Sequence, residues 1–250
     1  MSRWLKTMSL ALAIGAFLAM NIFLASCGSN NTQYRLFNAM SNPNATFNFD
    51  VTVNGGLVTG ASGLGFGSAQ PSTGYTGISS GGEGIAVYQV GTATTSGADP
   101  LVKSTVNLSG GNQYTVVLMG NSQSGLTPWV AQAFPDTNTL PSSGDIEFRV
   151  INAAPSLPGP VNIYIVPTMS ISGATPTFTG VAYGQPSQTP TEYATLPGGQ
   201  YFVYVTTSAG TPLFFPSSYN ESSGIYTLVL TDVQDGFTFY TQPWLLTDVK

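Results

Sequence analysis

The feature that most constrains the fold of this chain is an internal repeat. The segment YRLFNAMSNPNATFNFDV (34–51) aligns with FRVINAAPSLPGPVNIYI (148–165) at a constant offset of 114 residues. Identical residues pair at Arg35/Arg149, Asn38/Asn152, Ala39/Ala153 and Asn48/Asn162. Further blocks follow in the same order: the Gly-Gly turns at 81–82 and 198–199, then YTVVL (114–118) and YTLVL (226–230). Repeated blocks in one order indicate a tandem duplication.

Each copy has the pattern of an all-β domain. Short runs rich in Val, Ile, Tyr, Phe and Thr alternate with Gly, Pro, Asn and Ser, and no helical periodicity persists after the leader. Seven strands are expected in the first copy, at 34–39, 46–53, 57–66, 84–91, 100–108, 113–119 and 127–134. This number of short strands predicts two tandem immunoglobulin-like antiparallel β-sandwich domains. The predicted domains are 34–140 and 144–250, with the boundary in a polar linker at 135–145.

The N-terminus predicts a lipid anchor. A short basic segment and an apolar stretch are followed by Leu24-Ala25-Ser26-Cys27, which resembles the lipobox of bacterial lipoproteins. Residues 1–26 would then be the signal peptide, Cys27 the lipidated residue and 27–33 a short tether. Several acyl chains anchor stably because each buried CH₂ contributes roughly 0.8 kcal/mol. An uncleaved transmembrane helix is the alternative, since the apolar stretch is long enough to span a bilayer.

Gly28 bears on the membrane in which such an anchor would sit. It replaces the aspartate that resembles an inner-membrane retention signal, and this favours the outer membrane. The expected localisation is therefore the bacterial cell envelope, at the periplasmic or the external face.

Charge excludes one class of partner. Charged residues make up 7% of the chain, against about 25% in typical soluble domains. Removing the leader leaves four bases (Arg35, Lys103, Arg149 and Lys250) against eleven acids. Such a surface neutralises few phosphates, so nucleic acid is not expected as a partner. Because Cys27 is the only cysteine, no disulfide is expected either.

The repeated blocks resemble a known family. The Arg…Asn-Ala opening strand, the alternating strand after it and the YTVVL/YTLVL strand are similar, in both copies, to bacterial envelope proteins with the domain of unknown function 4397. The second copy, with Arg149, Asn152, Ala153 and Pro155, fits better than the first, where Ser41 stands in place of the proline. The resemblance implies a secreted β-sandwich module and no established activity.

Motifs of catalysis are weak. GISSG (77–81) places Ser79 in a nucleophile-elbow pattern, but that motif needs a following helix and a histidine base, and the chain has no histidine. The acids share almost no positions between the copies, so a paired-carboxylate glycosidase site is not expected. Without histidine only oxygen ligands remain for a metal. We therefore expect no enzyme activity, no cofactor and no metal site.

Two kinds of residue remain as candidate sites. Arg35 and Arg149 are the charged residues shared by both copies. We expect a structural role, as partners of carboxylates or strand carbonyls, with Asp136 and Asp248 at each unit's end as candidates; ligand recognition is the alternative. Sugar-stacking rings are the second kind, and the candidates are Trp129, Tyr240, Trp244, Tyr75 and Tyr193. Core packing is the alternative for each ring.

These expectations give one function and one alternative. The chain is interpreted as a non-catalytic cell-envelope lipoprotein, a structural or adhesive β-sandwich module at the membrane surface. Its partners would be the membrane, through Cys27, and a cell-surface glycan or an envelope protein. The alternative is a carbohydrate-binding or glycan-capture protein that uses exposed aromatic rings.

Overall fold

The predicted all-β class is confirmed. The computed structural model describes residues 31–41, 48–121, 127–188, 192–213, 216–235 and 238–249. Every element of regular secondary structure within these ranges is a β-strand. None of the described residues belongs to a helix long and apolar enough to cross a membrane.

The strands from Thr32 to Asp136, here called the first unit, form two sheets. They are β1 (Thr32–Ser41), β2 (Phe49–Val53), β3 (Gly56–Leu57), β4 (Ala69–Gln70), β5 (Thr76–Ile78), β6 (Gly81–Gln89), β7 (Val102–Leu108), β8 (Gln113–Asn121) and β9 (Val130–Asp136). The inner sheet has the order β4-β1-β8-β9, with β5 also paired to β1, and the outer sheet has the order β3-β2-β6-β7.

The strands from Asp145 to Val249, the second unit, form a corresponding pair of sheets. They are β10 (Asp145–Asn152), β11 (Val161–Val166), β12 (Phe178–Val181), β13 (Ala194–Pro197), β14 (Gly199–Thr207), β15 (Ser217–Glu221), β16 (Gly224–Asp235) and β17 (Thr238–Val249). The inner sheet is β13-β10-β16-β17 and the outer sheet β12-β11-β14-β15. In both units the opening strand pairs in parallel with the YT(V/L)VL strand: β1 with β8, and β10 with β16. The two-copy origin and the boundaries 34–140 and 144–250 stay predictions.

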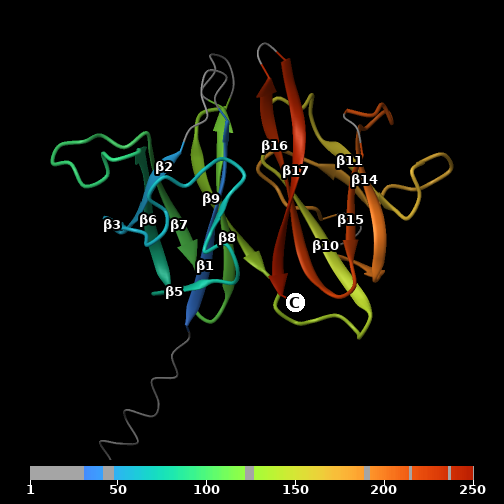
Figure 1. The fold of residues 1–250 in the computed structure, drawn as a ribbon, viewed down its shortest axis with the longest axis horizontal. Coiled ribbons are helices and arrows are strands. Elements are labelled where there is room, and N and C mark those ends of the chain that lie inside the picture. The colour runs from blue at the N-terminus through green and yellow to red at the C-terminus, as the bar shows by residue number, and fades with distance from the viewer. Residues whose placement is uncertain are drawn as a thin grey trace, which may run out of the picture.

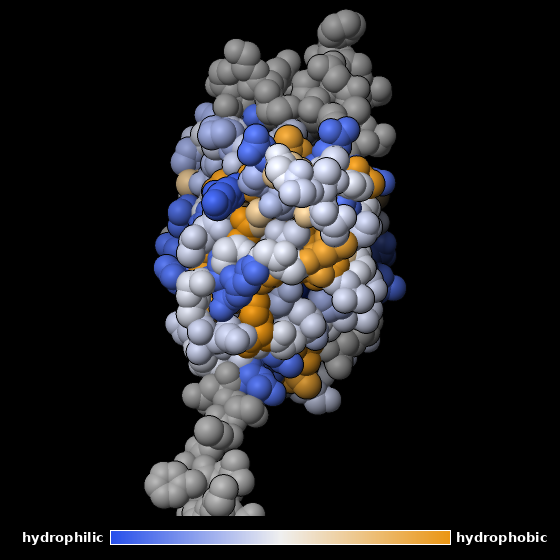
Figure 2. All heavy atoms as spheres, turned by 90° about the vertical axis from the view of Figure 1, so that its left-hand side faces the viewer, coloured by the Kyte–Doolittle hydropathy of each residue, from blue (hydrophilic) through white to orange (hydrophobic). Residues whose placement is uncertain are grey.

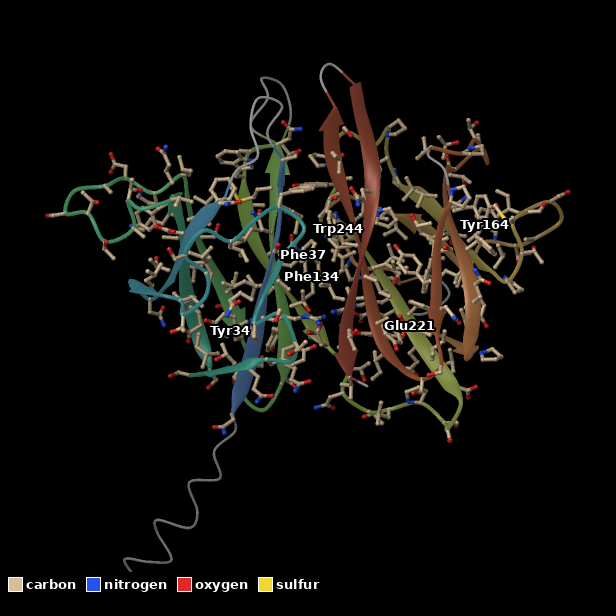
Figure 3. All side chains as sticks on the ribbon, viewed as in Figure 1. Tyr34, Phe37, Phe134, Tyr164, Glu221 and Trp244 are labelled. Atoms are coloured by element: carbon tan, nitrogen blue, oxygen red, sulfur yellow. The ribbon has the colours of Figure 1, made fainter. Side chains whose placement is uncertain are left out.

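The four sheets stack in the order outer, inner, inner, outer. Figure 1 shows the units side by side, with β1, β8 and β9 of the first unit toward β16 and β17 of the second. One apolar cluster fills each sandwich, and a third lies between the inner sheets. The third cluster includes Phe37, Val117 and Phe134 from the first unit and Ile151 and Val229 from the second. In Figure 3 the labelled Phe37, Phe134 and Trp244 lie where the two units meet.

Period-two alternation explains why the central strands are buried on both faces. In β1, Leu36 belongs to the core of its own sandwich, whereas Phe37 belongs to the cluster between the units. In β10, Val150 and Ile151 divide in the same way. Successive side chains of a strand point to opposite faces, and a strand that is covered on both faces reads as a nearly continuous apolar run. The opening strands therefore belong at the centre of the stack.

One expected strand is wrong. Within the segment 57–66 only Leu57 belongs to a strand, β3 (Gly56–Leu57), and Leu64 makes an isolated bridge to Phe49. Gly60 and Gly63 adopt φ of 80° and 71°, a left-handed conformation that a regular strand does not contain. The segment is a chain of turns instead, and the inner sheet gains β4 and β5 beyond it.

The outer face of the first unit is mostly polar (Figure 2). Figure 2 shows small separate apolar patches on a surface that is otherwise white and blue. The exposed apolar side chains of this unit include Leu57, Val90 and Leu101. Scattered apolar residues of this kind are ordinary on a soluble domain.

Candidate functional site

Arg35 projects from β1 into the region between the units. It is 3% exposed, and its Nη2 donates to Oδ1 of Asp248 at the end of β17. Its Nη1 donates to the carbonyl of Thr247 at 2.7 Å and its Nε to Oγ1 of Thr115 at 2.9 Å. The ion pair therefore joins the first strand of the first unit to the last strand of the second.

Arg149 makes the reciprocal contacts from β10. Its Nη2 donates to Oδ1 of Asp136, its Nη1 to the carbonyl of Pro135 at 2.5 Å, and its Nε to Oγ1 of Thr227 at 3.0 Å. A second carboxylate, that of Glu192, accepts from Nη1 at 3.2 Å. Asp136 and Asp248 are thus the carboxylate partners of the arginines, and each forms its ion pair with the arginine of the other unit.

Two threonines close these contacts into a ring. Thr115 Oγ1 donates to Oδ2 of Asp136 at 2.7 Å, and Thr227 Oγ1 donates to Oδ2 of Asp248 at 2.7 Å. Each hydroxyl accepts from one arginine and donates to the carboxylate held by the other. We call the six residues the arginine ring: Arg35, Thr115, Asp136, Arg149, Thr227 and Asp248.

The arginine ring balances two positive against two negative charges away from water. The side chains of Asp136, Arg149 and Asp248 are fully buried, and that of Arg35 nearly so. Removing a charge from water is costly unless it is paired and its hydrogen bonds are satisfied. The structure meets both conditions only when the two units are together, since each arginine takes its carboxylate from the other unit.

A tyrosine covers each arginine. The guanidinium carbon of Arg35 lies 5.1 Å from the ring centroid of Tyr75, and that of Arg149 lies 5.2 Å from Tyr193, within the range of cation–π attraction. Tyr75 donates its hydroxyl hydrogen to Oδ2 of Asp136 at 2.8 Å. Burial raises the pKa of Tyr193 to about 12, and it also raises that of Tyr75 although Arg35 opposes the shift. Both phenols stay protonated at neutral pH.

Two other buried acids, Asp50 and Asp232, hold loops. Asp50 accepts from Ser62 Oγ and from the backbone N–H groups of Gly63 and Gly91 at 3.1, 3.0 and 2.7 Å. Asp232 accepts from the backbone N–H and Oγ of Ser156 at 3.0 and 2.6 Å. Burial raises the pKa of Asp232, and the Ser156 bonds lower it in part. These carboxylates are fixed by the fold.

Two of the predicted sugar-stacking rings, Trp129 and Trp244, pack against different apolar clusters. Trp129 is half-buried, meets Phe49 edge-on at 5.5 Å and donates Nε1–H to the carbonyl of Ser41. Trp244 packs with the cluster between the units and donates Nε1–H to Oγ1 of Thr231 at 3.0 Å. Tyr240 lies on β17, and its side chain is outside the described part of the structure.

The remaining predictions divide between the exposed surface and the undescribed N-terminus. Ser79 lies exposed in the connection between β5 and β6, with no helix after it. Cys27 lies outside the described residues. Within the described ranges, no group of three or more His, Cys, Asp or Glu side chains is placed to hold a metal ion.

A cavity opens beside Arg35 at the edge of the contact between the units. It has a volume of about 720 Å³, and we call it the seam cavity. Its lining includes Gln33, Arg35, Gly74, Tyr75, Gln113 and Thr247. A second cavity, of about 550 Å³, lies on the first unit and includes Tyr34, Leu57, Gln70 and Thr76.

Sequence reasoning found the two arginines and their carboxylates but missed the rest of the ring. Thr115 and Thr227 stand at the second position of the YTVVL and YTLVL blocks, so the repeat itself carried their signal. The exchange of partners between the units was not visible, because equal spacing in two copies does not tell which copy supplies a contact.

A family model matches this chain. The domain of unknown function named DUF4397 matches residues 32–164, which is more than half of the sequence. The chain belongs to the DUF4397 family. The match extends from β1 through β10 and into β11, so it covers the whole first unit and the opening strands of the second. A search of curated proteins found no match to this DUF4397 chain.

Two solved structures show distant likenesses to this DUF4397 chain. One is a family CBM26 module of Eubacterium rectale Amy13K in complex with maltoheptaose, at 10% identity and a TM-score of 0.28, covering 86% of this chain and 96% of that one. The other is the Bacillus anthracis TIE protein, at 11% identity and a TM-score of 0.21, covering 81% of this chain and 33% of that one. These scores are too low to assign a shared topology.

Proposed function

We propose that this chain is a non-catalytic, lipid-anchored module of the bacterial cell envelope with a structural or adhesive role. The observation that carries the proposal is that buried charged side chains of this chain are held by contacts within the fold. Arg35 and Arg149 are two of the four bases that remain after the leader, and both are buried in the arginine ring. The buried carboxylates Asp50, Asp136, Asp232 and Asp248 hold loops or the ring.

This use of charge supports a scaffold rather than a catalyst. General acid–base and nucleophilic catalysis need ionisable groups that reach a substrate with a tuned pKa. The buried carboxylates and guanidinium groups of the described residues are engaged by the fold, so their removal would loosen the structure. A molecule whose two units share one buried charge network resists being pulled apart, which suits a protein exposed on an envelope.

The predicted anchor would hold this body near the bilayer. The first strand begins at Thr32, five residues after Cys27. Five residues reach about 17 Å at full extension. A triacylated Cys27 would therefore place the first unit close to the membrane surface, with little freedom to extend away from it.

The anchor is tested by fractionating cells that express the wild type, Cys27→Ser or Gly28→Asp. The wild type is expected in the outer membrane with acyl groups on Cys27, as measured by the mass of the N-terminal fragment. Cys27→Ser is expected to be soluble or retained with its leader. Gly28→Asp keeps the acylated cysteine and is expected to move to the inner membrane. A leader-free Cys27→Ser protein that still sediments with membranes would refute the anchor.

The role is tested by deleting the gene and measuring surface attachment and detergent sensitivity. Loss of either property, restored by the wild type and not by Cys27→Ser, is expected from a structural or adhesive module at the membrane. A deletion strain identical to its parent in both assays would contradict this role.

A further inference from the structure

Arg35 and Arg149 occupy equivalent places in the two units. The pairing of β1 with β5, and of β10 with β13, shows which residues beside the two arginines correspond. Tyr34 of β1 pairs with Thr76 of β5, and Phe148 of β10 pairs with Ala194 of β13. The residue before each partner strand is the covering tyrosine, Tyr75 or Tyr193. One residue earlier stands Gly74 in the first unit and Glu192 in the second.

This difference changes the hydrogen bonds of the arginines. In the second unit, Arg149 Nη1 donates to a backbone carbonyl, that of Pro135, and also to the carboxylate of Glu192. In the first unit, Arg35 Nη1 donates to the corresponding carbonyl, that of Thr247. Gly74 has no side chain to accept a second bond, so one N–H of Arg35 Nη1 has no partner among the described residues.

The seam cavity lies at this same corner. Arg35, Gly74 and Tyr75 line it, together with Ser72, Thr73 and Gln113. Gln113 donates Nε2–H to Gln33 at 2.8 Å, while its Oε1 is buried without a hydrogen-bond partner. The cavity therefore combines a guanidinium N–H that can bind an anion with the exposed hydroxyl groups of Ser72 and Thr73, which can exchange hydrogen bonds with a polyol. Its volume of about 720 Å³ is within the usual range for small-molecule sites, about 300–1,000 Å³.

We propose that the seam cavity binds the uronic-acid residue of an acidic saccharide. The sugar carboxylate accepts from Arg35 Nη1, as the Glu192 carboxylate does from Arg149. The second unit shows that an arginine of this ring accommodates two carboxylates, since Arg149 pairs with both Asp136 and Glu192. The hydroxyls of Ser72 and Thr73 at the cavity provide further hydrogen bonds to sugar. This binding role goes beyond the anchored scaffold and does not depend on it.

The first test is a calorimetric titration of the full-length chain, purified in detergent, with glucuronate, glucose and acetate. Glucuronate is expected to bind more tightly than either control, because glucose lacks the carboxylate and acetate lacks the hydroxyls. No heat with glucuronate, or equal binding of glucuronate and glucose, overturns the proposal. Acetate binding as tightly as glucuronate also overturns it, because the site would then recognise a carboxylate of any source, including an acidic peptide.

The second test supplies the missing carboxylate from the protein itself. Gly74→Glu is expected to weaken glucuronate binding about tenfold or more, the scale of one hydrogen bond to a charged group. Gly74→Ala is the matched control. Gly74 has φ +69°, and a Cβ added there would have no other atom within 4 Å, so both variants carry the same backbone strain and their Cβ atoms meet no clash.

Stability gives a readout that needs no ligand. If the glutamate reaches Arg35, Gly74→Glu is expected to unfold at a higher temperature than Gly74→Ala by circular dichroism. Equal glucuronate affinity in the two folded variants would place the binding site elsewhere and overturn the proposal. A failure of this test leaves the membrane fractionation unaffected, so the two proposals can fail separately.

Discussion

The corner around Arg35 and the corner around Arg149 have the same plan and differ in one acid. In each, an arginine takes a carboxylate and a carbonyl from the last strand of the other unit, a threonine from its own unit and the face of a tyrosine. Glu192 accepts a second hydrogen bond from Arg149 Nη1, whereas at Gly74 the seam cavity lies beside Arg35. The contacts that both arginines make hold the two units together. The position that differs, Gly74 or Glu192, is where one unit can acquire a separate role.

A second pair of positions shows the same trend. Asp232 follows Thr231 in β16 and binds Ser156, whereas the equivalent residue of β8 is Gly120. Gly120 has φ +118°, and a Cβ there would lie 2.5 Å from the carbonyl oxygen of Pro128. The second unit thus uses acids to fix its loops at two places where the first unit has glycine.

The largest expected effect comes from removing either arginine. Arg149→Met is expected to lower the free energy of unfolding by about 3–5 kcal/mol, because Asp136 is left buried without a counter-charge. Arg35→Met is expected to cost nearly as much. Urea denaturation followed by tryptophan fluorescence measures both.

The control for this prediction removes both charges of one pair. Arg149→Met combined with Asp136→Leu is expected to recover much of the loss, since no uncompensated charge remains buried. A loss below about 1 kcal/mol for either single variant would show that the arginine ring contributes little to stability.

A smaller effect is expected at the glycine of β8. Gly120→Ala is expected to cost about 1–3 kcal/mol, because its left-handed φ and the Pro128 carbonyl both oppose a Cβ. Gly74→Ala, which has the φ but open space, is expected to cost less in the same denaturation experiment. Equal costs at the two sites would mean that the contact with Pro128 is unimportant.

Removing the charge of Glu192, the second carboxylate beside Arg149, is expected to have a still smaller effect on the free energy of unfolding. Glu192→Gln should change the free energy of unfolding by less than about 1 kcal/mol, because its side chain is 40% exposed and water screens the pair. The difference should shrink further in high salt. A loss comparable to that of Arg149→Met would mean that Glu192 is as important as Asp136.

The smallest expected effect is a pH dependence that belongs to the second unit alone. Burial raises the pKa of Asp232 above its ordinary value of 3.8, so the folded state binds the proton more tightly than the unfolded state. The contribution of Asp232 to the free energy of unfolding is full below pH 3.8 and declines as the pH rises through the raised pKa. The stability of the wild type relative to Asp232→Asn should therefore fall as the pH rises from 3.8. Denaturation curves at several pH values measure this difference, and a rise would contradict the assignment.

The sequence predicted the elements that follow local pattern. Arg35 and Arg149 with Asp136 and Asp248 could be singled out because a chain so poor in charge repeats them in both units. The expected strand at 57–66 was wrong because Gly60 and Gly63 turn the chain in a way that an apolar run does not reveal. The exchange of arginine partners and the packing of Trp244 depend on how two sheets meet, and no single-chain periodicity encodes that arrangement.

We infer that the arginine ring makes the two units one cooperative body. The test is the hydrogen exchange of the outer-sheet strands β6 and β14, measured by mass spectrometry in the wild type and in Arg35→Met. These strands lie in different units, and the hydrogen bonds of Arg35 go to Thr115, Thr247 and Asp248, which are outside both strands. Arg35→Met is expected to accelerate exchange in both strands by the same factor, because both strands open through one global unfolding. Faster exchange in β6 with β14 unchanged would contradict it.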